Sequence, residues 1–246
     1  MTGRRILIVG ASSGIGRSLG LQATALGARV AFAARRAELV TAAAAEAGGG
    51  ALGVVMDVRD AASCATTVDR CLDAFGGLDA VVYSTAIDLL TRLTDATADT
   101  WADTFATNVT GAALVTTAAL PHLRAAQGRA VYISASSVDR PLPGMGVYAS
   151  SKAALETMVR AWQAEHPDVC FALARVGSAL GTDVTASWDR DLLVELSAGW
   201  HAKGYVHDNG PGGPMTVEQA AAAVLAVLTS PVWLREITAV SAPVAN

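Results

Sequence analysis

The chain has 246 residues, of which 52% are hydrophobic and 16% charged, and its formal net charge is −4. This composition provides a large apolar core and excludes a disordered chain, and the absence of a basic block excludes an obvious nucleic-acid or polybasic membrane surface. The three cysteines have no CxxC spacing and the four histidines have no ligand spacing, so we expect reduced core thiols and no metal site.

The N-terminal segment does not fit a leader peptide. Arg4 and Arg5 precede the apolar run Ile6–Val9, and glycine and serine follow it at once. A signal peptide needs about 7–15 apolar residues, and no uninterrupted apolar stretch approaches the ~18 that span a bilayer. We therefore expect a soluble, cytoplasmic protein that binds neither nucleic acid nor membrane.

Short apolar runs alternate with longer mixed segments along the whole chain. Most of the short runs lack strict alternation, as strands buried on both faces do. The runs that indicate strands are Ile6–Val9, Arg29–Ala34, Leu52–Met56, Ala80–Tyr83, Ala130–Ser134, Cys170–Val176 and Glu236–Val240. Segments long enough for helices lie between them at Gly16–Leu26, Glu38–Ala47, Ala61–Phe75 and Trp101–Leu120. This order predicts an α/β fold, a Rossmann-type doubly wound parallel sheet of about seven strands flanked by helices, as a single domain over residues 1–246.

Residues 182–214 interrupt this alternation. They contain Trp188, Trp200 and Tyr205, followed by the glycine- and proline-rich stretch NGPGGP. An excursion of this length in a compact domain is usually a lid or a binding segment. We predict a substrate lid here, and an exposed insertion or a subunit contact is the alternative.

A glycine-rich turn, GASSGIG, follows the first predicted strand. Gly10, Gly14 and Gly16 fall where a strand turns into a helix, and a turn of this kind lets a pyrophosphate approach the main chain. The helix N-terminus then offers free N–H groups to the phosphates. A flexible turn with incidental glycines is the alternative. We predict a dinucleotide site in which the pyrophosphate contacts Gly10, Ser12, Ser13, Ile15 and Gly16.

The end of the second strand indicates which dinucleotide is bound. An acidic residue there would bind the ribose 2′-OH of NAD. The strand instead ends in Ala33 and Ala34, and Arg35 and Arg36 follow, with no carboxylate before Glu38. A guanidinium pairs with a phosphate in a bidentate way, so NADP(H) is favoured over NAD(H). If the arginines are only solvated loop residues, this preference disappears.

The pentapeptide YASSK places Tyr148 and Lys152 four residues apart, on one face of a helix. Tyrosine has a pKa of about 10, and a nearby ammonium favours the phenolate and lowers that pKa. We expect Tyr148 to act in this way as a general acid or base. The alternative is an aromatic residue packed on an exposed helix edge.

Four motifs in this order resemble those of the classical short-chain dehydrogenase/reductase family, over residues 1 to about 182. They are GASSGIG, Asp57-Val58, NVTG with Asn108, and YASSK. The resemblance implies that Asp57 and Val58 contact the adenine. It also implies that Lys152 binds the nicotinamide ribose, and that Asn108 holds a water behind Lys152 to complete a proton relay.

One expected residue of that family is missing. The family carries a serine thirteen residues before the tyrosine, where it hydrogen-bonds the substrate oxygen, and this chain has Ala135. Serines flank it at Ser134, Ser136 and Ser137. We expect Ser136 to take the missing role. If no serine does so, catalysis is weakened rather than abolished.

Two further turns depart from the family pattern. Ser84-Thr85-Ala86-Ile87 replaces the NNAG turn after the fourth strand, with a glycine expected where Ala86 or Ile87 stands. Ala86 is still expected to lie against the cofactor. After the sixth strand Val176-Gly177-Ser178 replaces the usual Pro-Gly, and Thr182 is expected to contact the nicotinamide amide or the pyrophosphate.

The sequence therefore favours an NADP(H)-dependent oxidoreductase that interconverts a small-molecule carbonyl and an alcohol by hydride transfer, with a Tyr/Lys proton relay. Trp188 and Trp200 indicate an apolar or ring-containing substrate. One alternative is a catalytically weak or inactive NADP-binding sensor or structural subunit, and another is a dehydratase or epimerase on the same fold. Family resemblance implies a homodimer or homotetramer, with Trp101–Leu120 and Ala149–Ala164 as candidate contact helices.

Overall fold

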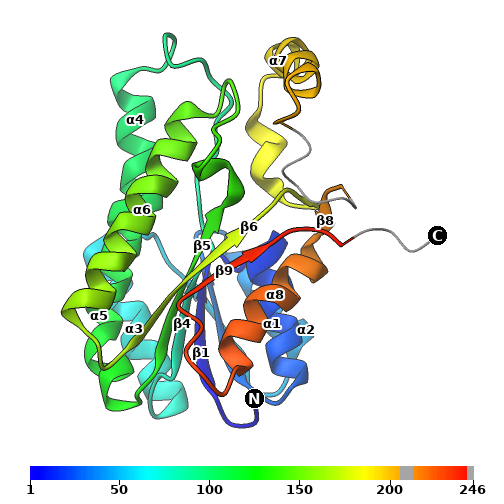
Figure 1. Cartoon of the computed structure of the whole chain (residues 1–246). Helices are drawn as coiled ribbons and strands as arrows, with labels where there is room; N and C mark the ends of the chain where they lie inside the picture. Colours follow the sequence, from blue (N-terminus) through cyan, green and yellow to red (C-terminus); the bar gives the residue numbers. More distant parts are fainter. Residues whose placement is uncertain (206–212, 243–246) are drawn as a thin grey trace.

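A seven-stranded parallel sheet forms the centre of the molecule (Figure 1). The computed structural model describes residues 1–205 and 213–242. The sheet order is β3-β2-β1-β4-β5-β6-β9, and every neighbouring pair is parallel. Its strands are β1 Arg5–Val9, β2 Arg29–Ala34, β3 Leu52–Val55, β4 Ala80–Tyr83, β5 Arg129–Ala135, β6 Cys170–Val176 and β9 Glu236–Ala239.

Helices cover both faces of this sheet. On one face lie α3 Ala61–Phe75, α4 Ala98–Phe105, α5 Gly111–Ala125 and α6 Gly146–Glu165 (Figure 1). On the other lie α1 Gly14–Ala25, α2 Ala37–Ala47 and α8 Val217–Thr229. The predicted doubly wound α/β fold is confirmed, and it is one domain.

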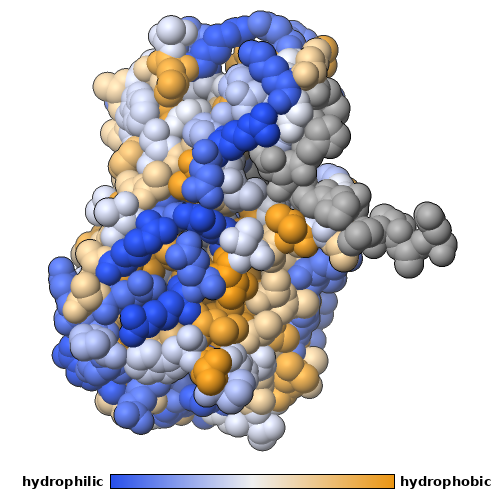
Figure 2. Space-filling model, in the orientation of Figure 1, coloured by the Kyte–Doolittle hydropathy of each residue, from blue (hydrophilic) through white to orange (hydrophobic). Residues whose placement is uncertain are grey.

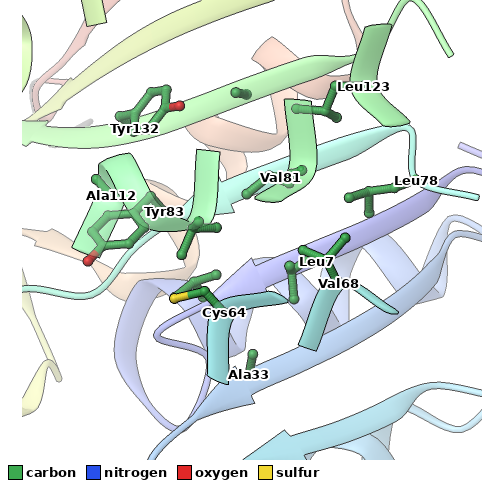
Figure 3. Packing of buried hydrophobic residues seen from close by; sticks show 14 of the residues in the cluster. Leu7, Ala33, Cys64, Val68, Leu78, Val81, Tyr83, Ala112, Leu123 and Tyr132 are labelled. Atoms are coloured by element: carbon green, nitrogen blue, oxygen red, sulfur yellow. The ribbon is translucent and has the colours of Figure 1, made fainter. Parts of the chain in front are cut away.

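Burial on both faces explains why the strand sequences are continuously apolar. In β1, Leu7 and Val9 belong to the cluster beneath α3 and α5, whereas Ile6 and Ile8 belong to the cluster beneath α1 and α8. Figure 3 shows the first cluster, in which Leu7 points toward α3. Burying each such side chain contributes roughly 1.5–3 kcal/mol, so both helical layers are held firmly to the sheet.

The predicted helix Trp101–Leu120 differs from the structure. α4 begins at Ala98, because the Thr97 hydroxyl caps it by accepting from Thr100 N at 3.1 Å. A π-helical segment, Ala106–Thr110, then separates α4 from α5. Such segments break the regular i to i+4 pattern and often occur at functional sites.

The segment predicted as a lid has local structure of its own. The short strands β7 Ala179–Leu180 and β8 Met215–Thr216 pair with each other, a 3-10 turn covers Asp183–Ser187, and α7 spans Arg190–Ala202. Part of the predicted lid, residues 206–212, lies outside the described residues. Its role as a lid stays a prediction.

The surface of the molecule carries both hydrophilic and hydrophobic residues. Figure 2 shows hydrophilic and hydrophobic residues interspersed on one face of the molecule. Within residues 1–205 and 213–242, no helix combines the length and the apolar character that crossing a bilayer demands.

Candidate active site

A cleft of about 460 Å³ lies at the carboxyl ends of the strands, beside the point where the chain order reverses between β1 and β4. Doubly wound sheets bind ligands at such a point. The cleft is lined by Val9, Gly10, Ser12, Ser13, Gly14, Ile15, Ala34, Arg35, Arg36, Met56, Val58, Ser84, Thr85, Ala86, Ile87, Asp88, Ile133, Tyr148, Lys152, Thr182, Asp183 and Ser187.

Two glycines of the turn, Gly10 and Gly16, lie too close to neighbouring backbone atoms to carry a side chain. A Cβ on Gly16 would lie 2.4 Å from the Gly10 carbonyl oxygen, and a Cβ on Gly10 would lie 2.6 Å from Thr85 N. Gly10 also has φ +86°, a region that favours glycine. The turn brings the N-terminus of α1 to the cleft, and the Ser13 side chain does not cap it. The first N–H groups of α1 are therefore available to an anion.

Both predicted arginines line the cleft next to this turn. One guanidinium nitrogen of Arg36 donates to the hydroxyls of Ser12 and Ser13 at 2.9 and 3.0 Å. The same nitrogen pairs with the Asp183 carboxylate at 2.9 Å. The Arg36 guanidinium, paired with Asp183, therefore lies beside the predicted phosphate-binding turn.

The predicted adenine end is only partly brought to the cleft. Val58 and Met56 line it, whereas Asp57 is not among the lining residues. The Asp57 carboxylate accepts from Arg59 N at 2.9 Å, and this hydrogen bond lowers the pKa of Asp57. Its side chain therefore stabilises its own turn, and contact with adenine stays a prediction.

Asn108 lies in the π-helical segment and is fully buried. Its Oδ1 accepts from Ile87 N at 2.7 Å, and its Nδ2 donates to Ile87 O at 2.9 Å and to the Ser151 hydroxyl at 2.9 Å. These bonds tie the turn after β4 to α6. The predicted water relay through Asn108 stays a prediction.

Tyr148 and Lys152 lie on α6 and both line the cleft. The Lys152 ammonium is 3% exposed and donates to the Ile133 carbonyl at 2.7 Å. It lies 5.7 Å from the centroid of the Tyr148 ring. The helix thus presents the pair on one face, as the spacing predicts.

Burial shifts the pKa of both residues of this pair. Burial lowers the pKa of Lys152 to about 8, against the opposing effect of Asp88 and Glu156. Burial, together with the carboxyl group of Asp88, raises the pKa of Tyr148. That Lys152 lowers the pKa of Tyr148 stays a prediction, since the causes that act on Tyr148 here, burial and Asp88, both raise its pKa. Tyr148 is therefore a protonated phenol at neutral pH, which suits proton donation.

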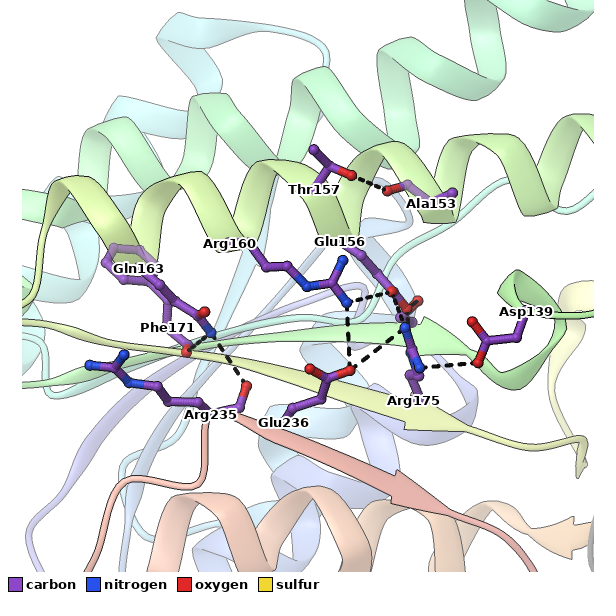
Figure 4. Close-up of polar contacts among 11 residues, drawn as sticks. Asp139, Ala153, Glu156, Thr157, Arg160, Gln163, Phe171, Arg175, Arg235 and Glu236 are labelled. Carbon is purple, nitrogen blue, oxygen red and sulfur yellow. Dashed lines mark hydrogen bonds and ion pairs between the residues drawn. The ribbon is translucent and has the colours of Figure 1, made fainter.

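The serines near Ala135 do not share one environment. Ser134 is buried and donates to Glu156 Oε1 at 2.8 Å. The buried Glu156 also pairs with Arg175 and with the more exposed Arg160 (Figure 4). Neither Ser136 nor Ser137 is among the described residues that line the cleft. The expected substrate role of Ser136 therefore stays a prediction, and it has no support from the shape of the cleft.

Thr182 lines the cleft, and its methyl group would lie 3.5 Å from a Cβ on Gly14. It therefore faces the phosphate-binding turn, which agrees with its predicted place beside the cofactor. Ala86 and Ile87 also line the cleft, although the turn lacks the expected glycine.

Asp88 is a lining residue that the sequence analysis did not identify. It is 6% exposed, and its Oδ1 is buried without a hydrogen-bond partner. Burial raises its pKa to about 7, although Lys152 acts in the opposite direction. The sequence signal that could have identified Asp88 is an acidic residue directly after the turn Ser84-Thr85-Ala86-Ile87, which follows a predicted strand.

Within the described part of the chain, no group of three or more histidine, cysteine or acidic residues could hold a metal ion.

Comparisons with known proteins identify relatives of the whole fold. The family described as short chain dehydrogenase matches residues 4–191. The chain is 30% identical over 229 residues to 11-beta-hydroxysteroid dehydrogenase-like 2 of Arabidopsis thaliana, covering 89% of this chain and 74% of the relative. It is 31% identical over 198 residues to cis-1,2-dihydrobenzene-1,2-diol dehydrogenase of Pseudomonas putida, covering 78% and 72%.

Solved structures share the same architecture. An alcohol dehydrogenase from the archaeon Thermococcus sibiricus, complexed with 5-hydroxy-NADP, matches with a TM-score of 0.81 at 24% identity over 96% of both chains. At that identity the match shows a common fold. A short chain dehydrogenase/reductase family protein matches with a TM-score of 0.78 at 27% identity, over 96% of this chain and 95% of the other.

Proposed function

This chain belongs to the short-chain dehydrogenase/reductase family and is an NAD(P)-dependent oxidoreductase, and we propose that it uses NADP(H) to interconvert a small-molecule carbonyl compound and its alcohol. The observation that carries the proposal is that one cleft holds the glycine turn, two arginines, and the Tyr148–Lys152 pair. These groups match the phosphates, the 2′-phosphate and the reacting end of such a dinucleotide.

The preference for NADP(H) rests on charge. No carboxylate ends β2 where a ribose 2′-hydroxyl would be bound, and Arg35 and Arg36 line the cleft there. The contacts of Arg36 with Ser12 and Ser13 hold its guanidinium beside the phosphate-binding turn. A 2′-phosphate in that place would gain charge-assisted hydrogen bonds.

In this proposal Tyr148 transfers a proton, and Lys152 positions the nicotinamide ribose. When bound, the nicotinamide supplies the hydride. Tyr148 donates its phenolic proton to the carbonyl oxygen as that oxygen gains negative charge. Lys152, held by the Ile133 carbonyl, offers its ammonium to the nicotinamide ribose and to the phenolate that remains on Tyr148. In alcohol oxidation the same proton moves in the opposite direction.

An apolar cluster packed against Tyr148 supports a ring-containing substrate, although Tyr148 alone of its residues is among the described residues that line the cleft. Leu90, Met145 and Trp200 form a buried cluster, and Tyr148 and Trp188 pack against it. The Trp188 and Trp200 rings meet edge to face at 6.3 Å. Apolar surroundings of Tyr148 favour hydrophobic carbocyclic compounds over polar ones, and two relatives are named for a hydroxysteroid and a dihydrodiol of benzene. We propose that residues 182–205 form part of the substrate lid.

A direct assay tests this function. NADPH absorbance is followed with benzaldehyde, acetophenone, cyclohexanone and α-tetralone. We expect turnover of at least one ring ketone by the wild type, and a loss of at least ~100-fold in Tyr148→Phe because a general acid contributes about that much or more. NADPH binding should be retained in the variant. Tyr205→Phe, which removes a hydroxyl near the same apolar cluster, serves as the matched control.

The same assay would also detect the two alternative functions. Binding of NADPH without turnover of any ketone, unchanged by Tyr148→Phe, would support a sensor or structural subunit. Ala135 favours that function, as does the absence of Ser136 and Ser137 from the described residues that line the cleft. Dehydration or epimerisation would appear in product analysis as a product without net oxidation or reduction.

We also propose that the protein works in the cytoplasm as a homodimer or homotetramer. Alanine-rich surfaces on α5 and α6 suit close packing across a two-fold axis. Light scattering of the purified protein measures the mass of the assembly, and a mass equal to one 25.1 kDa chain at working concentration contradicts the proposal.

A further inference from the structure

The cleft lacks a hydroxyl from the end of β5. Ala135 occupies the position where a serine would point toward the substrate, and Ser134 is bound to Glu156 at 2.8 Å. Neither Ser136 nor Ser137 lines the cleft among the described residues. A carbonyl oxygen placed beside Tyr148 would therefore have one hydrogen-bond donor fewer than the family provides.

Asp88, in the turn after β4, brings a polar residue to the lining of the same cleft. Its backbone is fixed on both sides, because Asn108 binds Ile87 through both main-chain groups and the Trp188 indole donates to the Asp88 carbonyl at 3.2 Å. The residue is 6% exposed. Asp88 lines the cleft with Tyr148 and Lys152, and its buried Oδ1 has no hydrogen-bond partner among the described residues. A buried polar atom without a partner is costly unless a ligand satisfies it.

The charge state of Asp88 follows from its surroundings. Among the described residues, Lys152 on α6 is the titratable group that acts on the pKa of Asp88, and Asp88 in turn raises the pKa of Tyr148 on the same helix. Lys152 favours the carboxylate, but burial outweighs it and raises the pKa of Asp88 to about 7. Near neutral pH, a large fraction of molecules therefore carry a neutral carboxylic acid, which can donate a hydrogen bond.

We propose that Asp88 orients the substrate: its neutral carboxyl donates a hydrogen bond to the same carbonyl oxygen that Tyr148 protonates, in place of the hydroxyl absent at position 135. This inference rests on the proposed carbonyl reduction. In that reaction the hydride adds to the carbonyl carbon, the electron pair of the C=O π bond moves to oxygen, and the proton comes from Tyr148. Asp88 keeps its own proton and contributes only the hydrogen bond.

The proposal predicts a specific pH dependence. Below about pH 7 the acid is protonated and donates, whereas above it the carboxylate would repel the developing alkoxide. The kcat for ketone reduction by the wild type should therefore fall as pH rises through about 7. Asp88→Asn keeps a neutral N–H donor at every pH, so it should retain activity and lose that step.

The experiment compares Asp88→Asn, Asp88→Ala and Asp73→Asn with the wild type, using NADPH and the ring ketone turned over fastest in the panel. Removal of one preorganised donor costs ~100-fold or more in kcat, so Asp88→Ala should lose about that factor while binding NADPH normally. Asp73 is exposed on α3 and provides the matched control. A wild-type kcat in Asp88→Ala, an unchanged pH step in Asp88→Asn, or the same loss in Ser136→Ala would overturn the inference.

A second measurement needs no turnover. The infrared difference between the wild type and Asp88→Asn should contain a protonated carboxyl band at about pH 6 that disappears by about pH 8. Absence of that band at the lower pH overturns the inference. Failure of the wild type to reduce any ketone would instead contradict the proposed function, and the two failures are thus distinguishable.

Discussion

The ammonium of Lys152 lies over the ring of Tyr148, 5.7 Å from its centroid, and is fixed there by a 2.7 Å hydrogen bond to the Ile133 carbonyl. The end of β5 thus positions a side chain of α6. Because burial raises the pKa of Tyr148, the phenol keeps its proton at neutral pH. This arrangement supports the proposal that Tyr148 donates a proton to a carbonyl oxygen in the cleft.

Because Arg36 pairs with Asp183, we expect removal of either charge to change the affinity for NADPH. Arg36→Ala should weaken NADPH binding by roughly 10- to 100-fold, because a hydrogen bond to a charged group contributes about 1.5–3 kcal/mol. Asp183→Asn should strengthen it, since the carboxylate no longer competes for the guanidinium. Fluorescence titration with NADPH and NADH measures both effects.

The control for that titration is Arg124→Ala, since Arg124 pairs with Asp168 away from the cleft. Equal losses for NADPH and NADH in Arg36→Ala would show that Arg36 does not read the 2′-phosphate.

The glycine turn predicts a steric effect at Gly16. In Gly16→Ala the new methyl group would lie 2.4 Å from the Gly10 carbonyl oxygen, so the turn must shift. We expect a loss of roughly 1–3 kcal/mol in the free energy of unfolding, together with weaker NADPH binding. Gly199→Ala is the matched control, because nothing lies within 4 Å of its Cβ position on α7 and alanine favours a helix. Unchanged NADPH affinity in Gly16→Ala would be inconsistent with this account of the turn.

Asn108 predicts a structural coupling between the turn after β4 and α6. Asn108→Ala removes three hydrogen bonds and leaves Ile87 N–H and C=O without their partner. Each unsatisfied buried group costs about 1–3 kcal/mol, so thermal unfolding should occur at a clearly lower temperature. Ser151→Ala, which removes only one of these bonds, should have a smaller effect. Equal effects of the two substitutions would contradict the coupling.

Asp88 predicts a pH-dependent stability. Its pKa is raised from 3.8 to about 7, so stability falls as the pH rises from about 3.8 to about 7, and the full cost of burying the carboxyl group is present above about pH 7. A difference of this size corresponds to up to about 4 kcal/mol. Asp88→Asn should therefore be more stable than the wild type at about pH 8 and no more stable at about pH 4.

Urea unfolding at the two pH values measures that difference, and Asp73→Asn on exposed α3 controls for removal of a surface charge. A stability gain for Asp88→Asn that does not depend on pH would show that the carboxyl group is not penalised by burial.

The sequence predicted the architecture well because burial on both faces leaves a clear signal. The strands Arg29–Ala34, Ala80–Tyr83 and Cys170–Val176 have the predicted bounds, since turns with glycine or charged residues delimit their apolar runs. The helix Trp101–Leu120 was wrong in detail, because its alanine-rich sequence fits an α-helix throughout. The π-helical segment at Asn108 depends on tertiary hydrogen bonds to Ile87, which local propensity does not contain.

The site was predictable where it depends on local spacing. The glycine turn lies in the cleft because it follows the carboxyl end of β1, and Tyr148 and Lys152 lie there together because they share one face of α6. The pKa of Tyr148 was not predictable, since it depends on burial by segments distant in sequence. Asp88 was missed for the same reason, because only the folded chain brings it to Lys152.

The central claim is that Tyr148 protonates a carbonyl oxygen that receives a hydride from NADPH. The most direct measurement uses NADPH deuterated at nicotinamide C4 and mass spectrometry of the alcohol formed from the ring ketone. The account predicts one deuterium at the carbinol carbon with the wild type, and in Tyr148→Phe at least ~100-fold slower formation of that alcohol with NADPH affinity unchanged. NADPH oxidation without deuterium in the product, or equal rates in the two proteins, would contradict it.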